Sequence, residues 1–187
     1  MRTLLIASIV LISLHGTSFS QPGGRVALYA DDQMQSCEIV DIHPGIVLVH
    51  VFHIGIPSST GIQFYAPTPE CWTGSVWLGD VFPSNAYGGT QNAWYGITLA
   101  HGACLNTPIY LGWMSFTTLG TGDRCCLYQV FPPEGEPSGW IAVVDCHDNK
   151  LAGGGRDAVI NPDGSCPCDL PVPTEQLTWG RIKSLYR

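Results

Sequence analysis

The sequence predicts an all-β fold, a two-sheet antiparallel β-sandwich of about nine strands held together by disulfides. Glycine and proline number 22 and 14 among the 187 residues, which favours turns over helices. Short apolar runs alternate with these turn residues, and no long amphipathic helix precedes the last ten residues. The eight cysteines, an even number, are typical of a disulfide-bonded exported domain.

The longest strand-forming stretch after residue 60 runs from Pro108 to Phe131 and predicts a hairpin. It breaks at the Gly-rich segment 120–123 and restarts at the adjacent Cys125 and Cys126. A strand that is apolar on both faces is usually covered on both sides, so we expect the first half at the centre of a sheet. Alternation places these apolar residues on opposite faces: Ile109, Leu111 and Trp113 on one, Tyr110, Met114 and Phe116 on the other.

Further strands are expected where apolar runs lie between turn residues. The sequence has no internal repeat and no linker long enough to divide it, so residues 21–173 are expected to form one sandwich domain. In chain order the expected strands are Val26–Tyr29, Ile46–His53, Gly61–Ala66, Ser75–Phe82, Trp94–His101, Trp140–Cys146 and Ala158–Ile160.

Residues 1–20 predict a cleaved signal peptide. Arg2 supplies the basic start, Leu4–Leu14 the apolar stretch, and 18–20 a small-x-small cleavage site that leaves Gln21 first. The apolar run is shorter than the ~20 residues that a membrane-spanning helix needs, and no other run reaches that length. We therefore expect secretion, or a place at the cell surface or in the periplasm, with no transmembrane segment after signal removal.

Residues 174–187 predict a tail with a short helix capped by Thr178. Its apolar stripe would dock on the domain or the end would be frayed; alternatively, the tail would serve as an attachment or sorting tag. The stripe consists of Trp179, Ile182, Leu185 and Tyr186, and the basic residues beside it are Arg181, Lys183 and Arg187.

Four disulfides are favoured over a metal site, because no pair of C-x-x-C motifs occurs. Adjacent Cα atoms lie ~3.8 Å apart, below the usual disulfide range, so Cys125 and Cys126 are expected to bond to different segments. We predict a Cys71–Cys104 bond, a bond from Cys146 to one of the adjacent pair, and a link from the C-terminal segment to the body. The eight residues are Cys37, Cys71, Cys104, Cys125, Cys126, Cys146, Cys166 and Cys168.

No stretch carries a catalytic motif, and an even cysteine count leaves no thiol for nucleophilic catalysis. Asp145, Asp148 and Asn149 offer oxygen ligands for calcium, although their spacing matches no calcium-binding loop and favours an ordinary Asx-rich turn. Glu134 and Glu136 offer paired carboxylates for glycoside hydrolysis, against the simpler interpretation of a solvated loop. No cofactor is expected.

His50 and His53 are three residues apart on an expected strand, so they should face opposite sides and share no ligand. The net charge of −7 and the lack of a basic stripe exclude nucleic acid as a partner. Aromatic residues outside the expected core faces either bury, stack on sugars or fill a protein interface. These candidate binding aromatics are Trp72, Trp77, Tyr87 and Trp94, with Tyr128 a further such ring.

Three stretches, Gly61–Phe64, Ala93–Ala100 and Ile109–Phe116, resemble strands of cohesin and related bacterial Ig-like sandwich domains. The resemblance covers roughly Val26–Ile160 and implies the same sandwich class. The ending TWGRIKSLYR is similar to the tails of uncharacterised exported bacterial proteins. Neither resemblance implies an enzymatic activity.

Together these features predict a secreted, non-enzymatic binding or structural domain that presents loops or an aromatic face to a protein or glycan. Two alternatives stay open: a secreted hydrolase with a carboxylate site, and a self-assembling subunit of an extracellular surface assembly.

Overall fold

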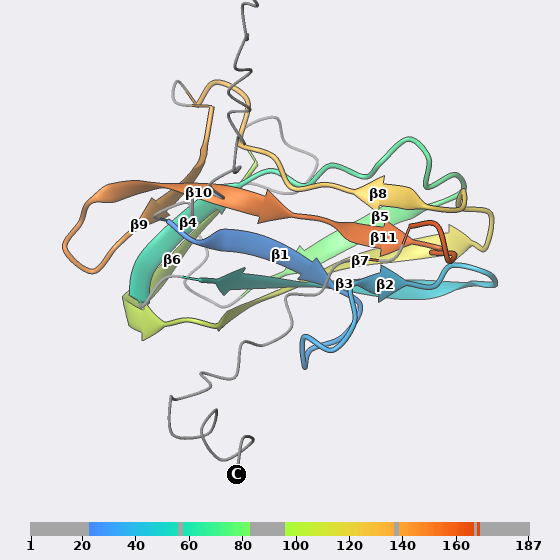
Figure 1. Ribbon diagram of the computed structural model, residues 1–187, viewed down its shortest axis with the longest axis horizontal. Helices are drawn as coiled ribbons and strands as arrows, with labels where there is room; N and C mark the ends of the chain where they lie inside the picture. Colours follow the sequence, from blue (N-terminus) through green and yellow to red (C-terminus); the bar gives the residue numbers. More distant parts are fainter. Residues whose placement is uncertain (1–22, 56–57, 83–95, 137–138, 167, 169–187) are drawn as a thin grey trace, which may run out of the picture.

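The computed structural model describes residues 23–55, 58–82, 96–136, 139–166 and 168 (Figure 1). Regular structure in these ranges consists of eleven strands, without a helix, which confirms the predicted all-β class. The strands are β1 (Arg25–Tyr29), β2 (Glu38–Ile39), β3 (Pro44–Ile54), β4 (Ser58–Phe64), β5 (Val76–Val81), β6 (Ile97–Asn106), β7 (Ile109–Leu119), β8 (Cys126–Tyr128), β9 (Ile141–Val144), β10 (Lys150–Arg156) and β11 (Ala158–Ile160).

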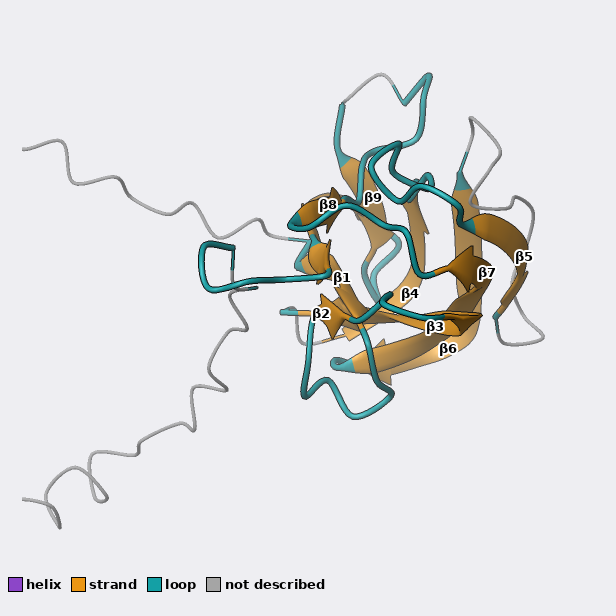
Figure 2. Ribbon diagram, turned by 90° about the vertical axis from the view of Figure 1, so that its right-hand side faces the viewer, coloured by secondary structure: helices purple, strands orange, loops and turns teal. Residues whose placement is uncertain are grey.

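The strands form two sheets that curl around a shared interior (Figure 2). The larger sheet has the order β5-β7-β3-β1-β10-β9-β4-β6, and the smaller has the order β2-β11-β8. Most neighbours are antiparallel, as predicted, but β1 with β10 and β2 with β11 are parallel. Each parallel pair joins two strands that are far apart in sequence, one from early and one from late in the chain. The strands that lie between them in sequence form the rest of the two sheets.

Three buried aromatic rings form the centre of the main core. Trp72 comes from the loop between β4 and β5, Phe116 from β7 and Tyr128 from β8. The Trp72 ring lies 4.6 Å from Phe116 and 5.9 Å from Tyr128, and the Tyr128 hydroxyl donates to the Ala66 carbonyl. This cluster ties both sheets together, and truncating any such ring would cost roughly 3–5 kcal/mol.

A second, smaller cluster covers the outer side of β1 and one end of β3. It contains Ala27, Tyr29, Cys37 and Phe52, and the rings of Tyr29 and Phe52 meet edge to face at 5.4 Å. The Cys37–Cys168 bond contributes both of its residues to this packing. The outer side of the sheet is therefore covered here by the segment that the disulfide holds in place.

The strand β7 is central, as predicted, since it pairs with both β3 and β5. The predicted division of its apolar residues between the two faces is wrong, because a bulge changes its register. Val51 faces Gly112 and Phe52 faces Tyr110, which leaves Leu111 as the extra residue. Consequently Ile109, Leu111, Met114 and Phe116 are all buried, and Trp113 turns toward the outer side.

The predicted hairpin across residues 108–131 is also wrong. The strand β8 pairs with β11 in the smaller sheet and does not pair with β7. After β7 the chain is held by the loop before β5: Asp123 N–H donates to the Cys71 carbonyl, and Thr73 and Thr121 donate to each other's carbonyls. These bonds direct the chain across the interior instead of back along β7.

The four predicted disulfides are present, with pairings that differ in part from expectation. The bonds are Cys37–Cys168, Cys71–Cys126, Cys104–Cys146 and Cys125–Cys166. The adjacent cysteines bond to different segments, as predicted. One link from the C-terminal segment to the body was predicted, and the structure contains two, through Cys166 and Cys168. Two predicted pairings are wrong: Cys71 with Cys104, and Cys146 with Cys125 or Cys126. Because β4 lies between β6 and β9, Cys104 lies near Cys146 instead.

The predicted signal peptide 1–20 and the predicted helical tail 174–187 lie outside the described residues. Within the described ranges, no helix has the length and apolar character needed to cross a membrane. Both terminal segments therefore stay predictions from sequence.

Replacing Cys71 and Cys126 together by alanine should lower the free energy of unfolding by about 2–4 kcal/mol. The bond closes a span of 55 residues, and Cys126 is buried in the main core. Urea denaturation of protein made under oxidising conditions measures the loss. The matched control is the Cys104/Cys146 pair, which closes 42 residues and includes the exposed Cys104, so its removal should cost no more. Unchanged stability of the Cys71/Cys126 variant would contradict this role.

Candidate binding surface

The outer sides of β3, β7 and β5 form one continuous surface along one side of the molecule (Figure 2). The register aligns their outward residues in rows: Ile46, Thr117 and Val76 form one row, since Thr117 faces both of the others. Trp113 likewise faces His50 on one side and Val81 on the other. Facing positions on neighbouring strands lie close together, so these side chains form a contiguous layer.

Six large aliphatic side chains on this surface are between 38% and 70% exposed. We call them the apolar face: Ile46, Leu48, Val76, Leu78, Val81 and Leu119. The three strands contain no Lys or Arg, and their only acidic residue is Asp80, which accepts a hydrogen bond from Trp77 Nε1. A surface of this kind in a chain of net charge −7 is unusual, because exposed faces normally carry charged side chains.

One end of the apolar face is polar and acidic. His50 Nδ1 and the Tyr110 hydroxyl lie 2.8 Å apart, and their rings stack. Burial lowers the pKa of His50, against the opposing effect of Asp32 and Asp31, and burial together with Asp32 raises the pKa of Tyr110. Both rings are therefore expected to be neutral near pH 7, beside a loop that carries two acidic residues.

The loop that carries Asp31 and Asp32 is fixed by one carboxylate. Asp31 accepts hydrogen bonds from the backbone N–H groups of Gln33, Gln35 and Ser36. Burial raises the pKa of Asp31, but these three bonds outweigh it and hold the pKa below its usual value. Asp31 thus stays charged and forms an acidic rim at this end of the surface.

Of the predicted binding aromatics, those that the structure describes do not gather at one place on the surface. Trp72 is buried in the main core, where Nε1 donates to the Asp41 carboxyl, so it cannot stack on a ligand at the surface. Tyr128 is buried as well. Trp77 is half-buried and packs against the core. Tyr87 and Trp94 lie outside the described residues, and the roles proposed for them stay untested.

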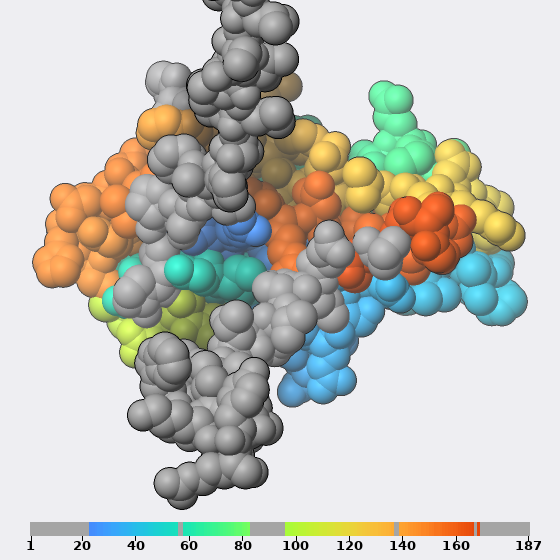
Figure 3. Space-filling model, viewed as in Figure 1, coloured from blue at the N-terminus to red at the C-terminus, as the bar shows by residue number. Residues whose placement is uncertain are grey.

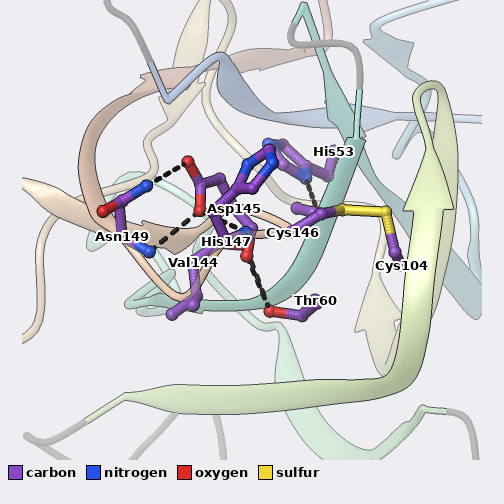
Figure 4. The surroundings of a disulfide bond; sticks show 9 residues. His53, Thr60, Cys104, Val144, Asp145, Cys146, His147 and Asn149 are labelled. Atoms are coloured by element: carbon purple, nitrogen blue, oxygen red, sulfur yellow. Dashed lines mark hydrogen bonds between the residues drawn. A yellow bond between two sulfur atoms is a disulfide. The ribbon is translucent and has the colours of Figure 1, made fainter.

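The candidate calcium residues lie in the turn between β9 and β10, beside the Cys104–Cys146 disulfide (Figure 4). The Asp145 carboxylate accepts bonds from His147 N–H and from the backbone and side chain of Asn149. These bonds, led by the Asn149 side chain, lower the pKa of Asp145. The carboxylate is thus engaged within its own turn, while Asp148 and Asn149 are exposed.

A group of metal-type ligand atoms elsewhere in the described chain does not favour a metal site either. Among the described residues, the one such group contains Cys125, Asp163 and Cys166, and its two sulfurs are bonded to each other. In the proposed carboxylate pair, Glu136 forms an ion pair with Lys150 at 2.8 Å, and Glu134 is exposed in the same loop.

The two histidines of β3 lie on opposite faces, as predicted. His50 is on the outer side, whereas His53 is buried with Nδ1 at 3.1 Å from the Ser59 hydroxyl and Nε2 at 3.0 Å from the Gly23 carbonyl. Burial lowers the pKa of His53 and also that of His101 on β6. These histidines are structural groups whose protonation opposes folding.

Sequence reasoning missed the apolar face. Residues 46–49 are apolar at every position, a pattern that predicts a strand buried on both sides. In the structure only Val49 of this run is fully buried, while Ile46 and Leu48 are exposed. The scarcity of charge in the three strands, which contain Asp80 and no Lys or Arg, was the available signal, because a surface with so little charge is rare in an acidic chain.

No protein-family model matches the chain, and no curated protein matches it. Its fold is similar to the sixth cohesin from Acetivibrio cellulolyticus' scaffoldin B, solved with a mutant Cel5 dockerin: TM-score 0.47, 11% identity, 75% of this chain and 99% of that chain. It is also similar to CaCohA2 from Clostridium acetobutylicum: TM-score 0.42, 12% identity, 79% and 96% covered. The seventh ScaB type I cohesin from Pseudobacteroides cellulosolvens gives 0.39 and 8% identity, with 78% and 96% covered. These values fit a weak cohesin-like resemblance and assign no function.

Acidification should destabilise the protein through histidines that are wholly or partly buried. Because the pKa values of His50, His53 and His101 are lowered in the folded state, the unfolded chain binds more protons once the pH falls below the usual histidine value of 6.5. The free energy of unfolding should therefore decrease from about pH 7.5 to about pH 5. The pKa values of Asp31 and Asp145 are also lowered, but these carboxylates affect stability only below their usual pKa of 3.8, outside this pH range.

Urea denaturation across this range measures the effect in the wild type and in His53→Gln. The variant should show a weaker pH dependence than the wild type. Stability that is constant or increases on acidification would contradict the assignment.

Proposed function

We propose that this chain is a non-enzymatic protein-binding domain whose apolar face docks a partner protein. The observation that carries the proposal is the exposure of six large aliphatic side chains on three adjacent strands without a basic residue. Contiguous exposed apolar surface is a feature of protein interaction sites, and interface centres are depleted in charge. Burying such a surface against a partner would supply most of the binding free energy.

The chemistry of the face favours a protein over a glycan. Sugar-binding platforms use aromatic rings for stacking together with polar groups that hydrogen-bond the hydroxyls. Here the exposed centre is aliphatic, formed by residues such as Ile46, Leu48 and Val76, and the aromatic Trp113 and Tyr110 lie at one end. Aliphatic side chains offer no such bonds, so a partner with its own apolar side chains fits better.

The partner is a different protein and not a second copy of this chain. The acidic rim at Asp31 and Asp32 calls for a basic group, and β3, β5 and β7 contain none that a second copy would bring. Within the described sheet β5 is an edge strand, and its bulge at Gly79 discourages pairing with the edge of another copy. We therefore infer a partner with an apolar surface flanked by Lys or Arg.

The protein is proposed to act outside the cytoplasm. Four disulfides indicate an oxidising compartment, and the predicted signal peptide offers the route. We propose that residues 21–173 act as the exported domain and 174–187 as a separable tail. The choice between secretion, the periplasm and the cell surface depends on the host envelope.

A displayed peptide library tests the proposed binding surface. Selection on the wild-type protein should enrich peptides that combine apolar side chains with Lys or Arg. Val76→Glu places a charge in the apolar face and should weaken these peptides by about ten-fold or more. The matched control is Leu127→Glu on β8, since Leu127 is 47% exposed on the other sheet and should tolerate the charge with no loss of binding.

Two outcomes would contradict the proposal. Peptides that bind Val76→Glu as tightly as the wild type would show that the apolar face is not the docking site. A wild-type dimer in sedimentation that Val76→Glu dissociates would assign the face to a second copy of the chain.

Export should yield a mature chain that begins at Gln21. The small-x-small residues 18–20 follow the apolar stretch directly and form the expected cleavage site. Mass spectrometry of the exported protein would detect this end, with or without cyclisation of the glutamine. Exported protein that retains Met1 would show that the predicted cleavage is wrong.

A further inference from the structure

A pocket of ≈ 540 Å³ lies where three segments meet at one end of the molecule. The segments are 38–42 at β2, 120–124 after β7 and 161–163 after β11. Figure 3 shows the residues after β11, in orange-red, beside the light-blue residues around β2. The pocket is distinct from the apolar face, although Gly120 follows the end of β7 directly.

Asp41 forms part of the pocket wall and is only 1% exposed. Its Oδ2 accepts hydrogen bonds from Trp72 Nε1 at 2.8 Å and from Gly122 N–H at 3.3 Å. Its Oδ1 is buried and accepts no hydrogen bond from the residues that the structure describes. A buried acceptor without a donor is costly and uncommon, so this oxygen calls for a donor from outside the described chain.

Asn161 holds the pocket in shape. Its side-chain nitrogen donates to the carbonyls of Asp41 and Gly122, and its Oδ1 accepts from Asp41 N–H at 2.7 Å. Asn161 therefore holds the backbone of Asp41, and Trp72 holds its carboxylate. The free oxygen is held in place before any ligand arrives, which lowers the entropic cost of binding.

The walls of the pocket select the class of donor. Val40 and Ile42 are 62% and 61% exposed and supply aliphatic surface. The lining contains more acidic than basic residues: Glu38, Asp41 and Asp163 against Arg124 alone. A positively charged donor carried on an aliphatic chain satisfies the acceptor, the charge and the apolar wall together.

A metal ion fits less well than such an ammonium group. Calcium takes six to eight oxygen ligands, usually with several carboxylates. Within the described part of the chain, the group of three metal-type ligand atoms does not include Asp41. A primary ammonium needs fewer acceptors, and its donors adapt to a site with one free carboxyl oxygen.

We propose that this pocket binds a primary ammonium group on an aliphatic chain, with Asp41 Oδ1 as its acceptor. A lysine side chain and a free alkylamine both carry this chemistry. The inference goes beyond the protein-binding function proposed above and does not rest on it, because its residues lie outside β3, β5 and β7.

NMR titration of the full-length protein with n-butylammonium tests the site. The Trp72 indole N–H and the Gly122 amide N–H both donate to Asp41, so their resonances should shift saturably. The same titration with n-butanol, which has the same alkyl chain without the charge, should give no saturable shift. Asp41→Asn should weaken n-butylammonium binding by about ten-fold or more, while Glu134→Gln in a distant exposed loop should leave it unchanged.

The source of the ammonium group is identified by a parallel titration with lysine blocked at both backbone ends. Binding of blocked lysine at least as tight as that of n-butylammonium assigns the site to a peptide side chain, and tighter n-butylammonium binding assigns it to a small amine. The inference is overturned if neither amine shifts the two resonances saturably, or if n-butanol shifts them equally. Unchanged binding by a folded Asp41→Asn variant would overturn it as well. Should that variant fail to fold, the wild-type comparison of amine with alcohol still decides.

Discussion

The change of register at Gly112 in β7 is the constraint on which the rest of the structure depends. It gathers Ile109, Leu111, Met114 and Phe116 on the buried side of the strand, so a single strand supplies the core along its full length. Gly112 has a φ of 131°, and an added Cβ would collide with the Val81 carbonyl of the neighbouring strand. The same bulge leaves the other side of β7 free to join the apolar face.

The end of the sandwich is organised around Trp72, which links packing to the pocket. Its ring packs on Phe116 and Tyr128, its neighbour Cys71 is bonded to Cys126, and its Nε1 holds Asp41. One residue thus closes the core and orients the carboxyl that lines the pocket. A substitution of Trp72 would therefore disturb both the packing of the core and the position of the Asp41 carboxyl in the pocket.

Local sequence patterns predicted most of the strands, whereas long-range contacts decided how the strands and the cysteines pair. The runs at Ile46–His53 and Ala158–Ile160 predicted strands that the structure contains, because strand propensity is local. The hairpin at 108–131 failed because the bonds from Thr121 and Asp123 to the loop before β5 are set by the tertiary fold. The Cys104–Cys146 bond needed the position of β4 between two strands, and the orphan oxygen of Asp41 has no sequence signature.

Carbene footprinting of the full-length, oxidised protein tests most directly whether the apolar face is exposed and available to a partner. A photolysed diazirine labels side chains according to their contact with solvent, so it reports on coverage by any part of the chain. Ile46 and Val76 should be labelled several-fold more than the buried Val49 of the same sheet, and to an extent similar to Leu127. Labelling of Ile46 and Val76 as low as that of Val49 would show that the face is covered and would contradict the account.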